Sequence, residues 1–251
     1  MKKTNFPEVG ILGMGEIGTS LYKIIREKYN VYGKTRHFDN IGKKKIDILH
    51  IAIVYDDNFI KAVIKQARLL KPKIIIIDST IPMGTTRKIT KLLRKNNIGV
   101  VHSFVKGVHP HLEEGIRTFT KYIGSCQPLV AKKVYRYFKQ LGLKPKIMKN
   151  PETTEAMKLW CTTQYGWFII LQKEIYKYCK KFKVDFNDIY THHNQDYNEG
   201  YEKLGMGNVR RPILKQINGK ISGHCVIPNC QILKTQNVDI AKIILKFNRG
   251  Y

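Results

Sequence analysis

Short apolar runs alternate with segments of helical periodicity through the first 150 residues of the chain. Continuous apolar runs of this length are typical of parallel strands that are buried on both faces. They predict strands at 9–12, 30–33, 47–54, 73–78 and 99–102. Apolar residues at spacings of three and four predict helices at 58–70 and 85–95. Strands that alternate with helices predict a doubly wound parallel sheet, which we expect to be extended by 122–124, 128–141 and 146–148.

Beyond residue 150 the pattern becomes helical. The segment 153–182 carries apolar residues nearly all round, which is typical of a helix buried on several sides, as between domains or subunits. A further helix after Asp185, a glycine-rich basic loop at 205–220 and a last helix at 238–247 follow. The pattern therefore predicts an α/β domain over 1–150 and an all-α domain over 151–251 with a long central helix.

The first predicted strand runs directly into a glycine-rich turn, G-x-G-x-x-G, and then into an amphipathic helix. In this context Gly13 permits a tight turn, Gly15 lets the backbone approach a pyrophosphate, and Gly18 lets the helix pack closely on the strand. The helix N-terminus adds N–H groups and the positive end of the helix dipole. A purely structural turn is the alternative. The sequence favours a Rossmann-type dinucleotide-binding turn formed by Gly13, Met14, Gly15, Glu16, Ile17 and Gly18.

The end of the second predicted strand bears on which dinucleotide is bound. Enzymes that use NAD usually place Asp or Glu there, on the ribose hydroxyl, whereas this chain has Thr35 followed by Arg36. Thr and Arg can bind a 2′-phosphate that a carboxylate would repel, so we expect NADP, with NAD as the alternative. Lys34 and Arg36 could instead be ordinary exposed charges. The residues expected to line the nicotinamide side end the next two strands and are Val54, Tyr55 and Thr80.

The composition limits the partners and the compartment. The formal net charge of +26 implies anionic partners, such as phosphorylated cofactors or acidic substrates, although a lysine-rich composition alone would also produce it. The basic residues are spread along the chain without a helix-turn-helix, RNP or zinc-finger pattern, so we do not expect a nucleic-acid partner. No stretch approaches the roughly 18 apolar residues of a membrane span. Five cysteines do not suggest a disulfide scaffold, and we expect a cytoplasmic protein.

Four segments resemble those of UDP-glucose/GDP-mannose (nucleotide-sugar) dehydrogenases. The sequence D-S-T-I-P-M-G-T-T at 78–86 is similar to their S-T-x-P-x-G-T-T turn, and E-A-M-K-L at 155–159 to their E-x-x-K-L catalytic helix. The segment 173–185 is similar to the N-E…G-I-D run that ends that helix, and S-G-H-C-V-I-P-N at 222–229 to their G-G-H-C-I-P-V-D loop. The order and intervals match over nearly the whole chain. The resemblance implies a Rossmann domain, a nicotinamide cofactor and dehydrogenase activity.

The resemblance also implies three catalytic residues. Lys158 would lie beside the hydride-transfer carbon, where an ammonium stabilises an alkoxide or polarises a carbonyl; otherwise it is a solvated helix lysine. Thr162 replaces the family's Asn one helical turn later, on the same face. Cys225 matches the thiolate that attacks the aldehyde formed in the first oxidation; otherwise it is a small buried apolar side chain. We do not expect a zinc site at His224, Cys225 and Cys230, because a second C-x-x-C is missing.

The chain departs from the family where a second oxidation would be completed. The family's P-E segment, whose Glu serves thioester hydrolysis, is replaced by 102–110, which is more similar to the P-V-S-G-G loop of the related β-hydroxyacid and 6-phosphogluconate dehydrogenases. The family Asp four residues after the cysteine is Asn229. The sequence also ends at Tyr251, before the family's further nucleotide-clamping domain. We therefore expect one hydride per turnover; the alternative is that Glu113 or Glu114 substitutes for the missing carboxylate. The candidate substrate-binding residues are Ser103, Lys106, His109 and His224.

The expected function is hydride transfer between the nicotinamide and an alcohol or carbonyl of a small anionic substrate. Two alternatives stay open: a β-hydroxyacid-type dehydrogenase of small carboxylates, and a catalytically silent basic protein that binds a dinucleotide or nucleic acid. His109 and His111 flank Pro110 in a loop that we expect to face the cofactor cleft, although they are more simply explained as surface histidines. The apolar surface over 159–175 exceeds what one small domain covers, so we expect a homodimer through the long helix. Burial of that helix within its own chain is the alternative.

Overall fold

The computed structural model describes residues 7–108, 110–216, 218–223 and 225–250. The chain divides into two compact units, Met1–Lys158 and Leu159–Tyr251, which we describe separately. The division falls inside a helix, whereas the sequence pattern put the domain boundary at 150.

The N-terminal unit contains a five-stranded parallel sheet in the order β2-β1-β3-β4-β5. Its strands are β1 (Val9–Leu12), β2 (Val31–Lys34), β3 (Ile48–Ile51), β4 (Ile74–Ile77) and β5 (Gly99–His102). The helices between them are α1 (Glu16–Ile25), α2 (Phe59–Leu70) and α3 (Thr85–Leu92), the last followed by a 3-10 turn at Arg94–Asn96. β1 lies between β2 and β3, with Val9 opposite both Val31 and Ile48, so the direction in which strands are added reverses at β1. The predicted α/β fold with a doubly wound sheet is confirmed.

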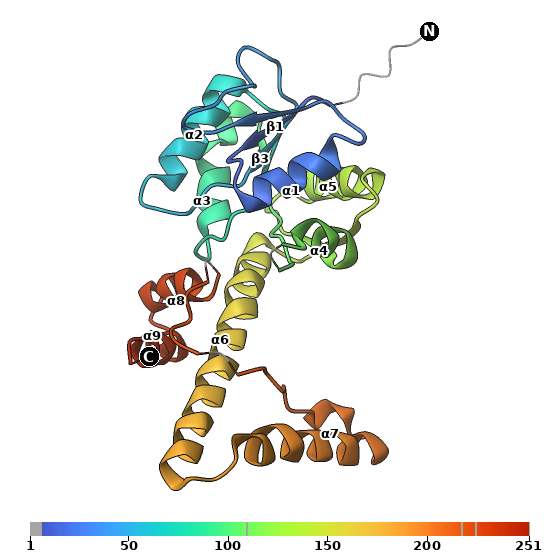
Figure 1. The fold of residues 1–251 in the computed structure, drawn as a ribbon. Coiled ribbons are helices and arrows are strands. Elements are labelled where there is room, and N and C mark those ends of the chain that lie inside the picture. The colour runs from blue at the N-terminus through green and yellow to red at the C-terminus, as the bar shows by residue number, and fades with distance from the viewer. Residues whose placement is uncertain (1–6, 109, 217, 224, 251) are drawn as a thin grey trace. The chain divides into compact units, whose positions relative to one another are not determined.

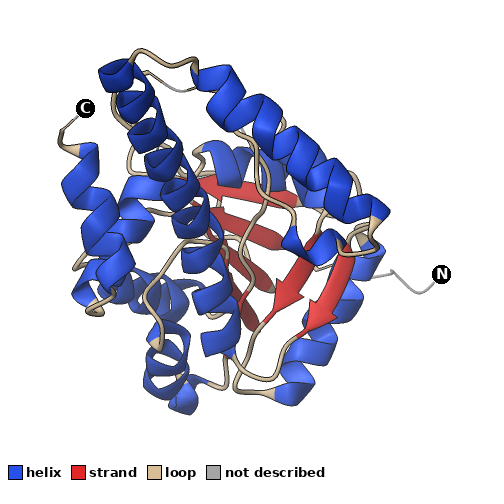
Figure 2. Ribbon diagram, turned by 90° about the horizontal axis from the view of Figure 1, so that it is seen from below, coloured by secondary structure: helices blue, strands red, loops and turns tan. Residues whose placement is uncertain are grey.

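Both faces of this sheet are buried. The four isoleucines of β4 alternate between two apolar cores: Ile74 and Ile76 face one, and Ile75 and Ile77 face the other. Figure 1 shows α1 and α5 (Pro128–Gln140) on the first side and α2 and α3 on the second. The same sandwich is visible from below in Figure 2, where the strands lie between helices. Burial on both faces explains why these strands read as continuous apolar runs.

The predicted extension of the sheet is wrong. The strands β6 (Thr120–Ile123) and β7 (Lys144–Ile147) pair in parallel in a sheet of their own, and only a bridge between His102 and Gly124 links them to β5. The edge of β5 is occupied by side chains instead. Val100 N–H donates to Gln127 Oε1, and Ser125 Oγ donates to Val100 O. A helix that the sequence pattern missed, α4 (Leu112–Thr118), precedes β6.

The long helix α6 (Pro151–Phe182) contributes its first turns to the N-terminal unit and the rest to the C-terminal unit. The C-terminal unit continues with a π-helical segment (Asn187–His192), α7 (His193–Lys203), a 3-10 turn (Gly207–Val209), α8 (Val226–Thr235) and α9 (Asp239–Asn248). Its core joins Ile169 and Ile170 of α6 to α8 and α9. A Cβ at Gly166 would lie 2.5 Å from Val226 Cγ1, so this glycine permits close packing of α8. None of the described helices is long and apolar enough to cross a membrane.

Candidate active site

The glycine-rich turn after β1 has three different local environments. Gly13 has φ +96°, and a Cβ there would lie 2.4 Å from Ala52 O. A Cβ at Gly18 would lie 1.8 Å from Gly13 O, so α1 can approach β1 only because residue 18 is glycine. Gly15 is exposed, and a Cβ there would meet no atom within 4 Å. Packing inside the protein therefore requires glycine at positions 13 and 18. At Gly15, by contrast, the space next to the turn is open.

Gly15 is also the N-cap of α1, and as a glycine it has no side chain to bond the first N–H groups of the helix. The N–H groups and the positive end of the helix dipole at a helix N-terminus are suited to a phosphate. The space beside Gly15 is what a closely approaching ligand would use.

Cations lie at the end of β2, together with an acidic residue, Asp39, that already forms an ion pair and backbone hydrogen bonds. The Lys34 ammonium lies 2.6 Å from Asp39 Oδ2, and Asp39 Oδ1 accepts from the backbone N–H groups of Ile41 and Gly42. The hydrogen bond from Lys34 and those backbone bonds hold the pKa of Asp39 below its ordinary value. Thr35 Oγ1 accepts from His37 N–H, and Arg36 is exposed. Arg36 is thus better placed than Lys34 to meet an added phosphate.

The ends of β3 and β4 lie at the same edge of the sheet as the glycine-rich turn, because the strands are parallel. Val54 is 87% exposed, and the Tyr55 ring packs on Phe59 at 5.3 Å between centroids. Ser79 Oγ donates to Ile53 O at 2.6 Å, which ties the two strand ends together next to Thr80. Parallel sheets of this topology bind ligands at this edge, outside the carboxyl ends of the strands.

Glu155 joins the first turns of α6 to the N-terminus of α3. Its carboxylate, fully buried, accepts from Gly84 N–H at 2.6 Å and from Thr86 N–H at 2.8 Å. Burial raises the pKa of Glu155, and the bonds from the helix terminus oppose that rise. Arg87 adds a two-point ion pair to Glu152, at 2.6 and 3.0 Å. The turn at 78–86 and the helix segment at 155–159 therefore form one packed structure.

Lys158 lies one turn beyond Glu155, at the end of the N-terminal unit. Its side chain is half-buried, and Nζ donates to Val105 O at 3.2 Å. His102 precedes this segment of chain and is fully buried, with Nδ1 2.8 Å from Thr154 Oγ1 on the first turn of α6. Burial lowers the pKa of His102 to about 3, so the ring is neutral at physiological pH. The ammonium of Lys158 is thus held between α6 and the chain that leaves β5.

A group of buried polar side chains in the same unit was not anticipated from the sequence. Lys121 Nζ lies 2.8 Å from Asp78 Oδ1, and Asp78 Oδ2 lies 2.7 Å from His50 Nδ1. His50 Nε2 lies 3.1 Å from the Tyr137 hydroxyl. All four side chains are almost fully buried. Asp78 belongs to the 78–86 motif, but nothing in the sequence pattern indicated its contacts with His50 of β3 and Lys121 of β6.

The predicted substrate-binding residues have different environments. Ser103 is fully buried and its hydroxyl donates to Tyr122 O at 2.7 Å, so it holds the fold together and is not accessible to a substrate. Lys106 places Nζ 4.7 Å from the centre of the Tyr122 ring. His111 is exposed and lies 3.2 Å from Glu114. His109 and His224 lie outside the described residues.

In the C-terminal unit, Thr162 Oγ1 accepts a hydrogen bond from Asn229 Nδ2, so the two residues that depart from the family pattern contact each other. Cys225 is exposed at the N-cap of α8, where the sequence pattern predicted a loop. Cys230 is buried, with Sγ 3.8 Å from Thr163 Oγ1. Over the described part of the chain, no three His, Cys, Asp or Glu side chains are grouped as a metal site requires.

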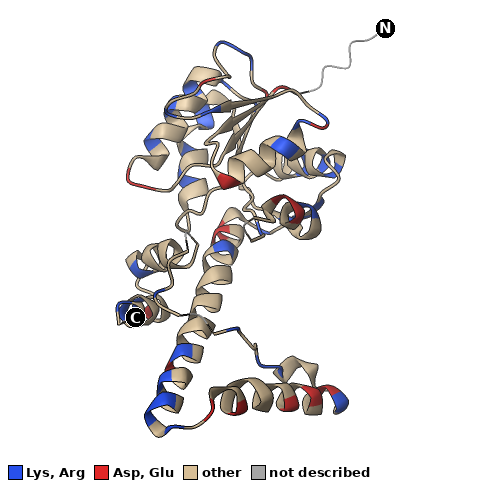
Figure 3. Cartoon of the chain, in the orientation of Figure 1, with Lys and Arg blue, Asp and Glu red and all other residues tan. Residues whose placement is uncertain are grey.

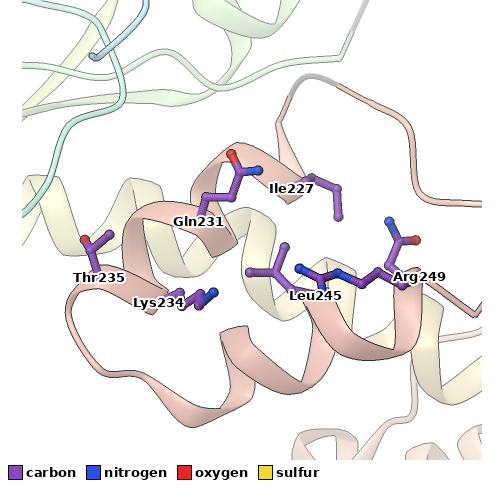
Figure 4. A pocket seen from close by; sticks show the side chains of 7 residues that line it. Ile227, Gln231, Lys234, Thr235, Leu245 and Arg249 are labelled. Atoms are coloured by element: carbon purple, nitrogen blue, oxygen red, sulfur yellow. The ribbon is translucent and has the colours of Figure 1, made fainter. Parts of the chain in front are cut away.

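A cavity of about 480 Å³ lies between α8 and α9 (Figure 4). Apolar side chains of Ile227 and Leu245 line it together with the cations Lys234 and Arg249. None of the residues predicted to bind cofactor or substrate contributes to it.

Comparison with known proteins gives similarity mainly at the level of structure. No protein-family model matches the chain. A curated relative, the uncharacterised protein MJ1054 of Methanocaldococcus jannaschii, is 29% identical over 129 residues, which are 47% of this chain but only 14% of that protein.

Three solved structures illustrate the structural similarity. UDP-D-ManNAc dehydrogenase from Pyrococcus horikoshii has a TM-score of 0.79 at 18% identity, over 96% of this chain and 68% of that one. A UDP-glucose dehydrogenase from Pyrobaculum islandicum has a TM-score of 0.75 at 13% identity, over 100% and 69%. The 3-hydroxyisobutyrate dehydrogenase of Mycobacterium tuberculosis has a TM-score of 0.70 at 12% identity, over 96% and 94%. The chain therefore has the fold that nucleotide-sugar dehydrogenases share with hydroxyisobutyrate dehydrogenase, as the sequence motifs predicted.

Proposed function

We propose that this chain is an NAD(P)-dependent oxidoreductase that transfers a hydride between the nicotinamide and an alcohol or carbonyl carbon of an anionic substrate. The observation that carries the proposal is the placement of Lys158. Glu155 ties its helix to the turn after β4, and Val105 O accepts from its ammonium. A cation is thus fixed in the same unit as the glycine-rich turn, by residues from the segments that resemble those of dehydrogenases.

The environment of the glycine-rich turn fits a dinucleotide. The N–H groups at the start of α1 would bind the pyrophosphate, with Gly15 giving it room. Thr35 and Arg36 would bind the adenosine ribose and its phosphate, and Val54, Tyr55 and Thr80 would face the nicotinamide. When bound, the dinucleotide supplies the carbon that accepts or donates the hydride.

Lys158 would act on the oxygen of the reacting carbon. Its ammonium would donate a hydrogen bond to the alkoxide or carbonyl oxygen and stabilise the negative charge that develops there. Thr162, four residues on, would donate a second hydrogen bond, because its hydroxyl accepts from Asn229 and keeps its own hydrogen to donate. We keep Cys225 as a candidate nucleophile because it is exposed.

The positive charge of the chain favours an anionic substrate. In Figure 3, Lys and Arg occur on most elements of both units, and the sequence has 45 of them against 19 Asp and Glu. A β-hydroxyacid-type reaction on a small carboxylate is the second candidate. It is favoured by the segment after β5, where Ser103, Phe104, Val105 and Lys106 supply no carboxylate for thioester hydrolysis.

A direct test is turnover with UDP-glucose, GDP-mannose and 3-hydroxyisobutyrate, followed by the absorbance of the reduced cofactor. Oxidation of any of them, with saturation in cofactor, supports the proposal. Binding of random-sequence DNA that weakens steeply with salt, together with no cofactor binding, would instead favour the silent basic protein.

The cofactor preference gives the first prediction. We expect NADP(H) to bind more tightly than NAD(H), because Arg36 is exposed and Lys34 already pairs with Asp39. Arg36→Ala should weaken NADP(H) by about 1–3 kcal/mol through loss of a charge-assisted hydrogen bond, and should leave NAD(H) nearly unchanged. Titration of nicotinamide fluorescence measures both affinities.

The matched control is Lys43→Ala, another exposed cation in the loop after β2. It should weaken NADP(H) much less than Arg36→Ala does, because it acts through general electrostatics alone. Equal affinity for both dinucleotides that Arg36→Ala does not alter would contradict the preference.

The second prediction is a homodimer through α6. Trp160, Leu171, Tyr178 and Phe182 are between 45% and 59% exposed. At 100° per residue these four side chains fall on the same side of the helix. Light scattering should give a dimer at micromolar concentration, and Leu171→Glu with Tyr178→Glu should give a monomer. Leu129→Glu, at a 74% exposed position on α5, should leave the dimer intact. A stable monomeric parent protein would refute this prediction.

A further inference from the structure

Lys121 of β6 is an ammonium buried in the N-terminal unit, with 3% of the residue exposed. An ammonium has three hydrogens to donate, and three acceptors surround this one. They are Asp78 Oδ1 at 2.8 Å, Ser103 O at 2.5 Å and Phe104 O at 3.2 Å. A buried cation persists only when its charge is paired and its hydrogen bonds are satisfied. The site meets both conditions.

The charge partner of Lys121 is itself fixed from the opposite side. Asp78, at the end of β4, gives its second oxygen to His50 of β3, and His50 bonds the Tyr137 hydroxyl of α5. Burial alone raises the pKa of Asp78, but Lys121 and His50 outweigh it, so that pKa is below its ordinary value. The carboxylate is therefore charged, and the position of the Lys121 ammonium is set by four secondary-structure elements.

The two carbonyl acceptors of Lys121 begin the segment that reaches Lys158. Ser103 has further bonds of its own, from its N–H to Ile77 O and from its hydroxyl to Tyr122 O. Phe104 O is bonded by Lys121, and the next carbonyl, Val105 O, accepts from Lys158 Nζ. The helix that carries Lys158 is anchored through Glu155 to α3 and through Thr154 to His102. The ammonium of Lys121 thus holds the two carbonyls that come directly before Val105 O.

We propose that Lys121 is a positioning residue, which holds the carbonyl segment 103–105 so that Val105 O fixes the ammonium of Lys158 for reaction. This rests on the proposed function, in which Lys158 acts on the substrate oxygen. Lys121 itself touches neither substrate nor cofactor.

The test follows Lys158 directly and needs no substrate. The full-length protein is labelled with a trace of acetic anhydride across a range of pH, and mass spectrometry gives the acetylation rate of each lysine. Lys121→Met keeps an unbranched side chain of similar length but removes the three N–H donors of the ammonium. We expect Lys158 to react about fivefold faster in this variant, the effect of releasing one hydrogen bond of about 1 kcal/mol. Lys173, a buried lysine of the C-terminal unit, should be unchanged.

Tyr137→Phe is the matched control. It leaves a buried nitrogen of His50 without its hydroxyl partner, so it destabilises the same core, but it keeps all three bonds of Lys121. It should lower the melting temperature without changing the pH profile of Lys158 acetylation. Equal acetylation of Lys158 in both variants and in the parent would overturn the proposal and leave Lys121 a purely structural residue.

If Lys121→Met does not fold, the double variant Asp78→Asn, Lys121→Met removes both buried charges while Phe104 O still lacks its donor. The proposal expects the same increase at Lys158, and an unchanged rate again overturns it. The proposed function fails separately: normal turnover by Lys158→Ala would refute it, whatever the acetylation rates show.

Discussion

Replacing Lys158 by Ala should lower the rate of hydride transfer by at least about a hundredfold, the usual effect of removing a positioned acid–base group. Its ammonium is held at Val105 O by a helix that Glu155 and Arg87 fix to the turn after β4. Since the side chain is only half-buried, the fold should survive, and the melting temperature should change little. Initial rates of cofactor reduction and a thermal melt measure the two effects.

Lys149→Ala controls for the loss of a positive charge, because Lys149 is exposed just before α6. It should leave the rate unchanged. Full activity of Lys158→Ala would remove the central residue of the proposed mechanism.

Cys225→Ser should keep much of the activity, because we expect one hydride per turnover. A second oxidation requires a carboxylate to activate water against the thioester. The segment after β5 offers Ser103, which is buried, and Lys106, whose ammonium faces aromatic rings. Asn229 cannot act as a base and bonds Thr162. Two equivalents of reduced cofactor per substrate, lost together in Cys225→Ser, would contradict this and favour a complete nucleotide-sugar-type dehydrogenase.

The parts of the fold that the sequence predicted are those in which local pattern and tertiary burial agree. The four isoleucines of β4 are apolar on both faces of a sheet covered on both sides, so their run indicated a parallel strand. The glycine-rich turn was also predicted correctly, because close packing leaves no room for a Cβ at Gly13 or Gly18.

The parts that were missed are decided by residues far apart in sequence. Lys121 lies in T-K-Y-I, which reads as a strand with a solvated lysine, and it is buried only because Asp78 lies opposite. Glu155 was matched to a motif, but its contact with the start of α3 spans 69 positions. The strands β6 and β7 were expected to join the main sheet because nothing local revealed that Gln127 covers the edge of β5.

The helix α8 was missed for a different reason. Pro228 and the glycine before Cys225 suggested a loop, yet proline is tolerated in the first turn of a helix, where the first N–H groups have no intrahelical acceptor. As a result, Cys225 lies at the N-terminus of a helix. The residues around the cysteine did not predict this position.

Substitutions of two glycines in the glycine-rich turn should have different effects. One should lower stability, and the other should weaken dinucleotide binding alone. Gly18→Ala would put a Cβ 1.8 Å from Gly13 O, so α1 must move away from β1. We expect a loss of stability of about 1–3 kcal/mol, as for overpacked cores, and with it the loss of dinucleotide binding. Thermal unfolding and cofactor titration measure the two losses.

Gly15→Ala is the matched variant, because its Cβ would meet no protein atom within 4 Å and its φ of −76° suits any residue. The melting temperature should stay near that of the parent. The methyl group would occupy the space that a pyrophosphate needs, and loss of one charged hydrogen bond of about 1.5–3 kcal/mol would weaken binding by about ten- to a hundredfold. Unchanged dinucleotide affinity in Gly15→Ala would mean that the open space beside α1 is not the phosphate site, and that the turn serves the fold alone.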